Sequence, residues 1–320
     1  MNERNKYAVG VDLGGTNIKI GMVSQAGKII KRCSIRTEAD EGPKRIIENI
    51  KRGIYEIQTK TNVTFDGIGI GCPGIVNPDK GTVENPPNFL GWKKVNVGKA
   101  ISMEFETDVF IENDANAAAI GELIFGNGSN FNSFIMVTLG TGVGGGIVIN
   151  RKVYHGEFGA AGEIGHISID YKGPKCRCGS RGCIEAYAGN NYLIRSVKEK
   201  LKKQKDSILN LLIENNYELL TPKKIKEAAD KGDEFSISVI EDLGIKLGAA
   251  FASLSNTLDI STYIIGGGVA GFGIPLFNSI KRSLKDRVMA PLKPRIKIFS
   301  AKLKNDAGIK GASALVFHGY

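Results

Sequence analysis

The sequence predicts an α/β protein with two domains, and three observations support this prediction. The chain has 320 residues, a length that favours two domains at about 150 residues per domain. Along the chain, apolar patterns typical of strands alternate with patterns typical of helices. A pair of strands around a glycine-rich turn occurs once in each half, at residues 14–16 and 140–146. We therefore expect two α/β domains that face each other across a cleft.

The first part of the chain begins with apolar runs separated by short turns, a spacing that predicts antiparallel strands. Isoleucines then recur at helical spacing over residues 38–60. Residues 73–92 are rich in Pro, Gly and Asn, and we expect a loop there. The predicted strands cover residues 7–13, 18–23, 29–35, 65–72 and 109–111, and the predicted helices cover 38–60, 96–105 and 113–125.

The second part has strong strand patterns on both sides of its glycine-rich turn, followed by a long helical stretch with lysine-rich exposed faces. The strands are expected at residues 133–139, 145–149, 263–265 and 296–300, and the helices between 190 and 255 and at 274–290 and 308–318. We expect the last helix to pack back on the first domain. One domain would then comprise residues 1–118 plus about 305–320, and the other residues 119–304, with a ligand loop at 166–183.

The composition is that of a globular protein, because 42% hydrophobic and 24% charged residues exclude wholesale disorder. No apolar run reaches about 18 residues, so we expect no membrane partner. The polar N-terminus has no signal-peptide core, which favours a cytoplasmic location. The net charge of +10 is concentrated in part at residues 281–310, where aromatic residues are sparse. We interpret this stretch as a solvated basic face, not a nucleic-acid site.

The first glycine-rich turn is a candidate phosphate loop. Gly14 and Gly15 let the backbone approach an anion closely, and Thr16 adds a hydroxyl donor. Asp12 stands where a carboxylate could hold a Mg²⁺ ion that bridges phosphates. An ordinary glycine hairpin with Asp12 as a turn former is the alternative.

Two further glycine clusters strengthen the phosphate interpretation. Gly140, Thr141 and Gly142 repeat the Gly-Thr pattern between strong strands, so the two turns could clamp a polyphosphate from both sides. Gly266, Gly267 and Gly268 follow a buried strand, where the flat ring of a nucleoside could lie against the backbone. The alternative for the cluster at residues 140–142 is a flexible linker. The alternative for residues 266–268 is a simple exit from the strand into a loop.

A carboxylate suited to proton transfer follows the predicted strand at 109–111. Asn113 and Asp114 stand at a strand end and a helix start, which is a usual place for function in α/β sheets. Asn113 could hold a sugar hydroxyl while Asp114 accepts a proton from another. On residue type alone, helix capping is the stronger interpretation.

Three cysteines and one histidine have the spacing H-x₉-C-x-C-x₄-C, formed by His166, Cys176, Cys178 and Cys183. They make a complete tetrahedral ligand set for a structural Zn²⁺ site. Glu163 and Glu185 flank this loop and are candidate ligands for sugar hydroxyls, with two ordinary surface acids as the alternative.

Two other nucleotide-binding motifs and one hydrolase motif are excluded. The match to G-x-G-x-x-G at residues 69–74 is followed by a loop and not by a helix, so we interpret it as accidental. The sequence contains no P-loop and no G-x-S-x-G elbow.

Six motifs in order resemble the ROK family (repressors, open reading frames and sugar kinases), and most closely its bacterial-type glucokinases. The resemblance spans nearly the whole chain. It is carried by Asp12-Leu-Gly-Gly-Thr16, Cys72-Pro73-Gly74, Glu112-Asn-Asp-Ala-Asn116, Leu139 to Gly146, Glu163-Ile-Gly-His166 and the cysteine loop that ends at Glu185.

The resemblance implies the actin-like ATPase (ribonuclease H-like) fold and the ATP-dependent phosphorylation of the 6-hydroxyl of an aldohexose, glucose first. It implies that Asp114 is the general base and that Gly74, Asn113, Glu163, His166 and Glu185 bind the sugar. It also implies that His166 ligates zinc while its other ring nitrogen faces the sugar. Homo-oligomers, dimers or tetramers, are usual in the family.

Two alternatives stay open at the level of sequence. The acceptor could be N-acetylmannosamine or N-acetylglucosamine, because the shape of its pocket cannot be deduced from residue types. The chain could also be a sugar-responsive regulator without turnover. Family repressors carry an added N-terminal helix-turn-helix domain, for which the sequence before Asp12 leaves no room, so we expect no nucleic-acid partner.

Overall fold

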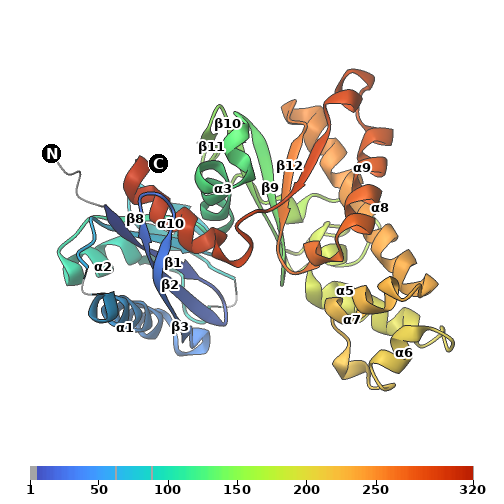
Figure 1. Cartoon of the computed structure of the whole chain (residues 1–320), viewed down its shortest axis with the longest axis horizontal. Helices are drawn as coiled ribbons and strands as arrows, with labels where there is room; N and C mark the ends of the chain where they lie inside the picture. The colour runs from blue at the N-terminus through green and yellow to red at the C-terminus, as the bar shows by residue number, and fades with distance from the viewer. Residues whose placement is uncertain (1–5, 62, 88, 320) are drawn as a thin grey trace. The chain divides into compact units, whose positions relative to one another are not determined.

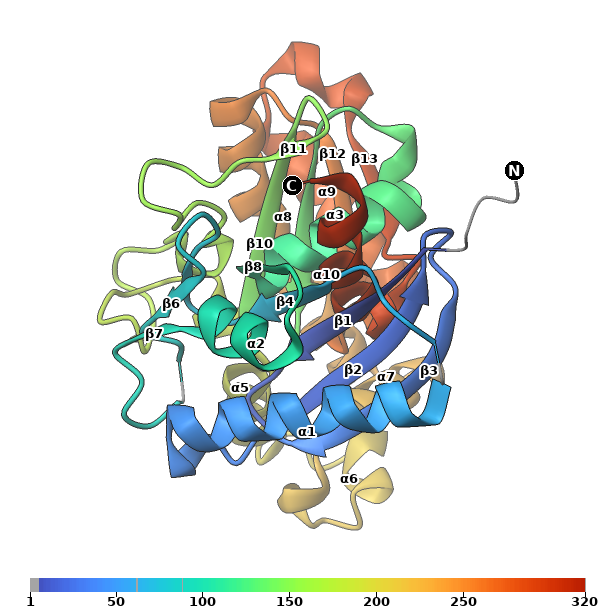
Figure 2. The same ribbon diagram turned by 90° about the vertical axis from the view of Figure 1, so that its left-hand side faces the viewer.

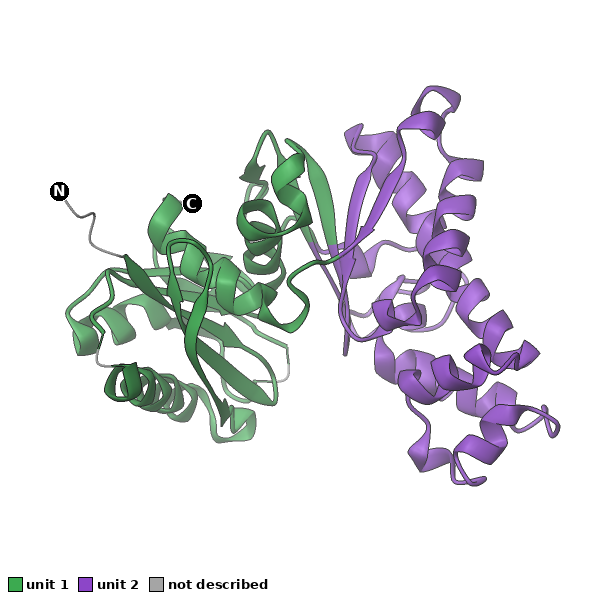
Figure 3. Ribbon diagram, viewed as in Figure 1, with its two compact units in different colours: residues 1–136, 146–162, 301–320 green, residues 137–145, 163–300 purple. Residues whose placement is uncertain are grey.

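The structure is a computed structural model that describes residues 6–61, 63–87 and 89–319. The chain divides into two compact units (Figures 1 and 3). Unit 1 comprises Met1–Met136, Gly146–Gly162 and Ala301–Tyr320, and unit 2 comprises Val137–Gly145 and Glu163–Ser300. Within the described ranges, no helix is both long and apolar enough to cross a membrane.

A five-stranded sheet in the order β3-β2-β1-β4-β8 forms the centre of unit 1. As the hairpin spacing predicts, β1, β2 and β3 are antiparallel neighbours. Strand β4 lies parallel to β1, and β8 lies parallel to β4, so the carboxyl ends of these three strands meet at one edge. The strands are β1 (Tyr7–Leu13), β2 (Asn17–Ser24), β3 (Ile29–Arg36), β4 (Ile68–Cys72) and β8 (Val109–Asn113).

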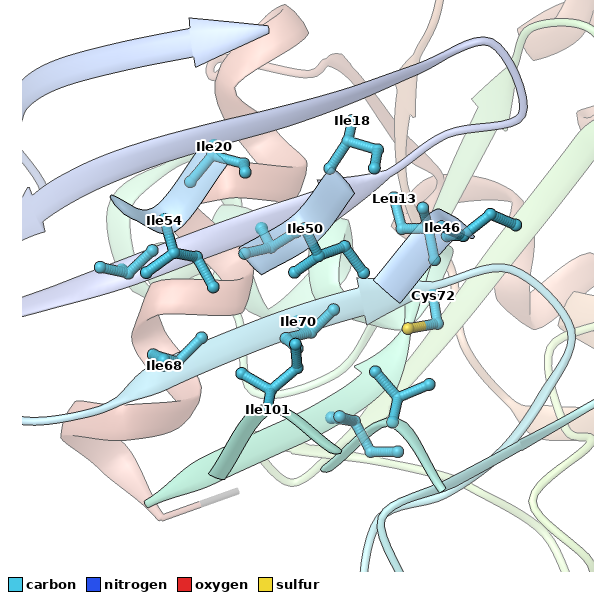
Figure 4. Close-up of a cluster of buried hydrophobic side chains, with 14 of the residues drawn as sticks. Leu13, Ile18, Ile20, Ile46, Ile50, Ile54, Ile68, Ile70, Cys72 and Ile101 are labelled. Atoms are coloured by element: carbon cyan, nitrogen blue, oxygen red, sulfur yellow. The ribbon is translucent and has the colours of Figure 1, made fainter. Parts of the chain in front are cut away.

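Helices α1 (Pro43–Thr61) and α2 (Val97–Phe105) cover one face of this sheet (Figure 2). Ile46, Ile50 and Ile54 recur at helical spacing on α1 and are fully buried against strand side chains (Figure 4). The predicted helix starts too early, because Glu38 has a left-handed backbone (φ 55°) and a short 3₁₀ turn, Ala39–Glu41, precedes Pro43.

Helix α10 (Ala307–His318) packs against β1 and β4. A Cβ atom on Gly10 or Gly69 would overlap the backbone of α10, so glycine in these strands lets the helix approach closely. The prediction that the last helix packs on the N-terminal strands is confirmed.

The segment at residues 73–92 is not a loop throughout, and this prediction was wrong. It contains β5 (Ile75–Asn77) and β6 (Thr82–Glu84), which form a three-stranded sheet with β7 (Lys94–Asn96). Strands of three residues are too short to show an alternating pattern in the sequence. A buried indole stabilises this sheet, since Trp92 Nε1 donates to the Val83 carbonyl over 3.1 Å.

A second five-stranded sheet has the order β11-β10-β9-β12-β13. Its strands are β9 (Phe134–Leu139), β10 (Val143–Ile149), β11 (Lys152–Val153), β12 (Thr262–Gly266) and β13 (Lys297–Ser300). The helices of unit 2 are α4 (Glu185–Ala188), α5 (Asn190–Leu201), α6 (Ile208–Leu212), α7 (Pro222–Asp230), α8 (Glu234–Leu258) and α9 (Ile274–Arg287). The strands and helices predicted for this part of the chain are confirmed, while the two-residue strand β11 and the short helix α4 were not predicted.

The compact units differ from the expected domains, which placed residues 119–304 in one body. Helix α3 (Asp114–Phe125) packs along α10, and a Cβ atom on Gly146 would meet Ala119 of α3. Because α10 belongs to unit 1, residues 119–136 and 146–162 join the same unit.

Candidate functional site

The carboxyl ends of β1, β4 and β8 bring two predicted site acids to one edge of the sheet in unit 1. Asp12 of β1 pairs in register with Gly71 of β4, and Cys72 pairs with Asn113 of β8. Burial raises the pKa of the Cys72 thiol, and the charges of Asp114, Asp12 and Glu112 raise it further. Three carboxylates therefore act on this one buried thiol, at the edge where ligands bind in α/β sheets.

The first glycine-rich turn is held in place through its carbonyl groups. Buried Thr37 donates from its amide to the Thr16 carbonyl over 2.9 Å and from its hydroxyl to the Gly14 carbonyl over 2.6 Å. Gly15 and Thr16 themselves are exposed. With its carbonyls bound behind it, this loop can present amide groups to an anion. Thr37 was missed at the level of sequence, because nothing in its own neighbourhood marks it.

The Asp12 carboxylate lies beside a lysine and a helix start. Lys19 Nζ is 3.2 Å from Asp12 Oδ2, and the backbone of Gly308, in the first turn of α10, lies against the same carboxylate. The Asp12 side chain is 20% exposed, so it remains accessible to a ligand. A carboxylate oxygen here is a suitable donor for Mg²⁺.

Asn113 and Gly74 lie together at the start of α3. Asn113 Oδ1 caps the helix by accepting from the amides of Ala115 (2.9 Å) and Asn116 (3.2 Å). Its Nδ2 donates to the Gly74 carbonyl over 3.1 Å. The capping interpretation of Asn113 is thus confirmed, and an amide NH₂ keeps a second hydrogen for another acceptor.

Asp114 is the first residue of α3, where the helix dipole favours a negative charge. Its Oδ1 accepts from the Ala115 amide over 2.8 Å. This contact and the Asn113 cap fix the position of the carboxylate relative to the strand ends. Glu112, two residues before Asp114, is buried and contacts His155. The sequence placed Glu112 in a family motif without giving it a role, and His155 was not singled out. The scarcity of histidine, with three in the chain, was the available signal.

In unit 2, the second glycine-rich turn contacts a predicted sugar ligand. Glu185, the first residue of α4, accepts from the Val143 amide at Oε2 over 3.0 Å. A Cβ atom on Gly142 would overlap this carboxylate. The turn is also bound to α5, since the Asn190 amide donates to the Gly140 carbonyl over 2.9 Å, while Thr141 is exposed.

The third glycine cluster also lies beside this turn. Strand β12 ends at Gly266, and the backbone of Gly267 (φ 90°) lies against the carbonyl of Leu139, which precedes the turn. Gly267 and Gly268 are exposed, and a Cβ atom on Gly268 would meet nothing within 4 Å. The two clusters of unit 2 thus adjoin where Gly267 meets Leu139, and Gly266 itself is buried.

The four predicted metal ligands lie together. The ligand atoms of His166, Cys176, Cys178 and Cys183 are all within 4.8 Å of one another. His166 Nδ1 is 3.7 Å from Cys176 Sγ, and the sulfurs of Cys178 and Cys183 are 3.6 Å apart. This donor set of three sulfurs and one imidazole fits Zn²⁺ in a closed tetrahedral site.

The thiols of this cluster differ in how readily they ionise. Burial raises the pKa of Cys183 to about 12, whereas a backbone hydrogen bond at Ser180 lowers the pKa of Cys178. A divalent cation would stabilise the thiolate forms.

His166 connects the metal cluster to a second predicted sugar ligand. Its Nδ1 is on the side of Cys176, while its Nε2 is 3.9 Å from Glu163 Oε2. The Glu163 side chain is 54% exposed. A metal bound at Nδ1 would leave Nε2 as a donor beside the Glu163 carboxylate.

Comparisons with known proteins agree with this geometry. The family model described as "ROK family" matches residues 8–318. A glucokinase of Halalkalibacterium halodurans is 36% identical over 316 residues, which are 98% of this chain and 95% of that protein. The xylose repressor of Bacillus subtilis is 29% identical over 318 residues, and the match spans 99% of this chain and 78% of the repressor.

Among solved structures, a ROK family glucokinase from Streptomyces griseus, in complex with glucose and AMPPNP, superposes with a TM-score of 0.84 at 33% identity. The match covers 97% of this chain and 98% of that one. The actin-like ATPase fold, an α/β fold, is thereby confirmed. The likeness extends over both compact units and all six sequence motifs, and the chain belongs to the ROK family.

Proposed function

We propose that this protein is a glucokinase, an enzyme that transfers the γ-phosphoryl group of ATP to the 6-hydroxyl of glucose. The observation that carries the proposal is the edge of the sheet in unit 1, where Asp114 stands at a helix start on the same edge as Asp12 and the first glycine-rich turn. The identities to glucokinases of more than 30% along nearly the whole chain support the choice of substrate.

Asp114 is the general base in this proposal. Phosphoryl transfer to an alcohol requires a group that accepts the hydroxyl proton while the oxygen attacks phosphorus. Asn113 binds a sugar hydroxyl with the second hydrogen of its Nδ2 amide, and the adjoining Gly74 contacts the sugar through its backbone. The capping hydrogen bonds of Asn113 fix its side chain beside Asp114, a placement suited to holding a substrate hydroxyl near the base.

The remaining sugar ligands are Glu163, His166 and Glu185. Carboxylates accept hydrogen bonds from hydroxyl groups. Glu185 is oriented by the Val143 amide, and the exposed Glu163 carboxylate lies 3.9 Å from His166 Nε2. His166 donates to the sugar from Nε2 in this proposal.

Residues 14–16 and 140–142 bind the phosphates of ATP, and residues 266–268 accommodate its nucleoside. Gly15, Thr16 and Thr141 are exposed and would present backbone amides as donors, whereas the amides of Gly14 and Gly140 already donate to Asn17 and Gly142. Asp12 would hold Mg²⁺, which when bound neutralises charge on the phosphates.

His166, Cys176, Cys178 and Cys183 would hold a structural Zn²⁺. When bound, such an ion would order the loop between Glu163 and Glu185 without contributing to the chemical step. A dimeric or tetrameric state and a cytoplasmic location also stay predictions.

Two other functions compete with this proposal. Phosphorylation of N-acetylmannosamine or N-acetylglucosamine uses the same residues and a different acceptor pocket. The second competing function is that of a sugar-responsive regulator without turnover. The similarity to a xylose repressor is the reason to test this function as well.

A coupled assay of ADP formation across a panel of hexoses distinguishes the three functions. We expect ADP release that depends on glucose, and ³¹P NMR should identify glucose 6-phosphate as the product. Turnover with an N-acetylhexosamine alone would transfer the proposal to that substrate. Sugar binding without any ADP release would establish the regulator instead.

A further inference from the structure

The Glu112 carboxylate is the buried charge closest in sequence to the proposed base. Its side chain is 3% exposed, and it lies one residue before the cap of α3. Three donors meet it: the Asn113 amide (2.7 Å) and Asn116 Nδ2 (3.1 Å) at Oε1, and His155 Nε2 (2.6 Å) at Oε2. Two of these donors belong to the strand end and the helix that position Asp114.

His155 is the cationic partner of this carboxylate. In the part of the chain that the structure describes, the ion-pair partner of Glu112 is His155. A buried carboxylate is costly unless it is paired and hydrogen-bonded, so a protonated imidazole at 2.6 Å stabilises the ionised form. The same carboxylate accepts from the Asn113 amide and from Asn116 Nδ2, and hydrogen bonds to an ionised acceptor are stronger than those to a neutral one.

The segment that carries His155 is itself ordered by close contacts. The His155 carbonyl accepts from the Ala161 amide over 3.1 Å, and the backbone of Gly159 lies against the Val76 carbonyl of β5. These contacts order the segment within unit 1, in the stretch that ends at Gly162.

The charges that face the pair favour protonation of His155. The hydrogen bond to Glu112 raises the pKa of His155 above its ordinary value, burial opposes this effect, and the charge of Asp79 adds to it. On the other side, Glu112 shares the sheet edge with Cys72, Asp114 and Asp12. Because the pKa of His155 is raised in the folded state, the free energy that this ion pair contributes to folding is fully present below the ordinary histidine pKa. It is lost as the pH rises through the raised pKa.

We propose that protonated His155 is a positioning residue for Asp114: it holds the Glu112 carboxylate, which in turn fixes the Asn113 amide and the start of α3. This inference rests on the proposed function, in which Asp114 is the base. It assigns His155 no contact with substrate. It implies that turnover decreases on the alkaline side when the imidazole loses its proton.

The kinetic test compares kcat and KM across pH for the wild type and for His155→Gln, which keeps a donor but loses the charge. We expect kcat at neutral pH to fall about 10- to 100-fold, as for a misplaced catalytic group, with KM for ATP unchanged. The decrease of kcat at alkaline pH that is expected for the wild type should be absent in His155→Gln.

The matched control is His318→Gln, which replaces a histidine at the end of α10 and should keep the wild-type pH profile. A His155→Gln enzyme with wild-type kcat, with an altered KM alone, or with the alkaline decrease intact would overturn the proposal.

A second measurement does not depend on turnover. NMR titration of the imidazole should give a raised pKa for His155 in the wild type and a lower one in Glu112→Gln. Hydrogen exchange should be faster in His155→Gln than in the wild type at two backbone amides. These are the Asn113 amide, which donates to Glu112, and the Asn116 amide, which donates to the Asn113 cap. An ordinary His155 pKa in the wild type, or unchanged exchange at these amides, would refute the positioning role. A wild type that phosphorylates no hexose would refute the proposed function alone, and these two readouts would still decide on the pair.

Discussion

Single side chains at this site perform structural and functional tasks together. Asn113 caps α3 with its side-chain oxygen and donates from its side-chain nitrogen to the Gly74 carbonyl. A residue predicted from its type to be a helix cap therefore also holds Gly74, which is proposed to contact the sugar. Glu185 similarly begins α4 and accepts from the Val143 amide. The capping interpretation and the binding interpretation are therefore compatible for the same residue.

Replacement of Gly142 by alanine tests the position of Glu185. The new Cβ atom would overlap the Glu185 carboxylate and push it from its present place. We expect Gly142→Ala to raise KM for glucose about 10-fold, in the range of one lost hydrogen bond to a charged group, and to leave thermal stability nearly unchanged.

The matched control is Gly271→Ala, because a Cβ atom there would meet nothing within 4 Å and the residue lies outside the proposed site. It should leave KM for glucose at the wild-type value. An unchanged KM for glucose in Gly142→Ala would exclude Glu185 from sugar binding.

At the scale of elements, close approach between α10 and the strands of unit 1 depends on the absence of side chains at Gly10 and Gly69. We expect Gly69→Ala to reduce the free energy of unfolding by about 1–3 kcal/mol, as for an overpacked core. Thermal unfolding would show this as a lower Tm. Gly271→Ala is the control, since its Cβ atom would meet nothing within 4 Å and its stability should match the wild type. Equal Tm values for both variants would contradict the close packing of α10.

The metal loop is the second element that can be tested alone. Cys178→Ser removes one of four ligands, and we expect loss of zinc, measured by elemental analysis, together with a lower Tm. Cys33→Ser lies outside the cluster and should keep both the zinc and the Tm. A wild type purified from zinc-replete medium without zinc would contradict the proposed structural site.

At the scale of the whole molecule, the sequence predicted what is encoded locally. Isoleucine periodicity predicted α1, hairpin spacing predicted the antiparallel strands, and the cysteine loop was recognisable because its four ligands lie within 18 residues of one another. The return of α10 to the N-terminal strands was predicted as well.

Long-range contacts were beyond the reach of these local patterns. His155 meets Glu112 across 43 positions, and Thr37 binds Gly14 across 23, with no periodicity to indicate either contact. The short strands β5 and β6 were missed because three residues show no alternation. The units are set by the packing of α3 on α10, which depends on distant parts of the chain.

The most direct test of the account concerns the Asp114 carboxylate. Asp114→Asn keeps the size of the side chain but cannot accept the proton of the 6-hydroxyl, and Glu104→Gln on the surface of unit 1 is the matched control. We predict that Asp114→Asn lowers kcat by about 10²–10⁴-fold, the usual contribution of a general base, while calorimetry shows glucose binding close to that of the wild type. Near-normal turnover in Asp114→Asn would contradict the account.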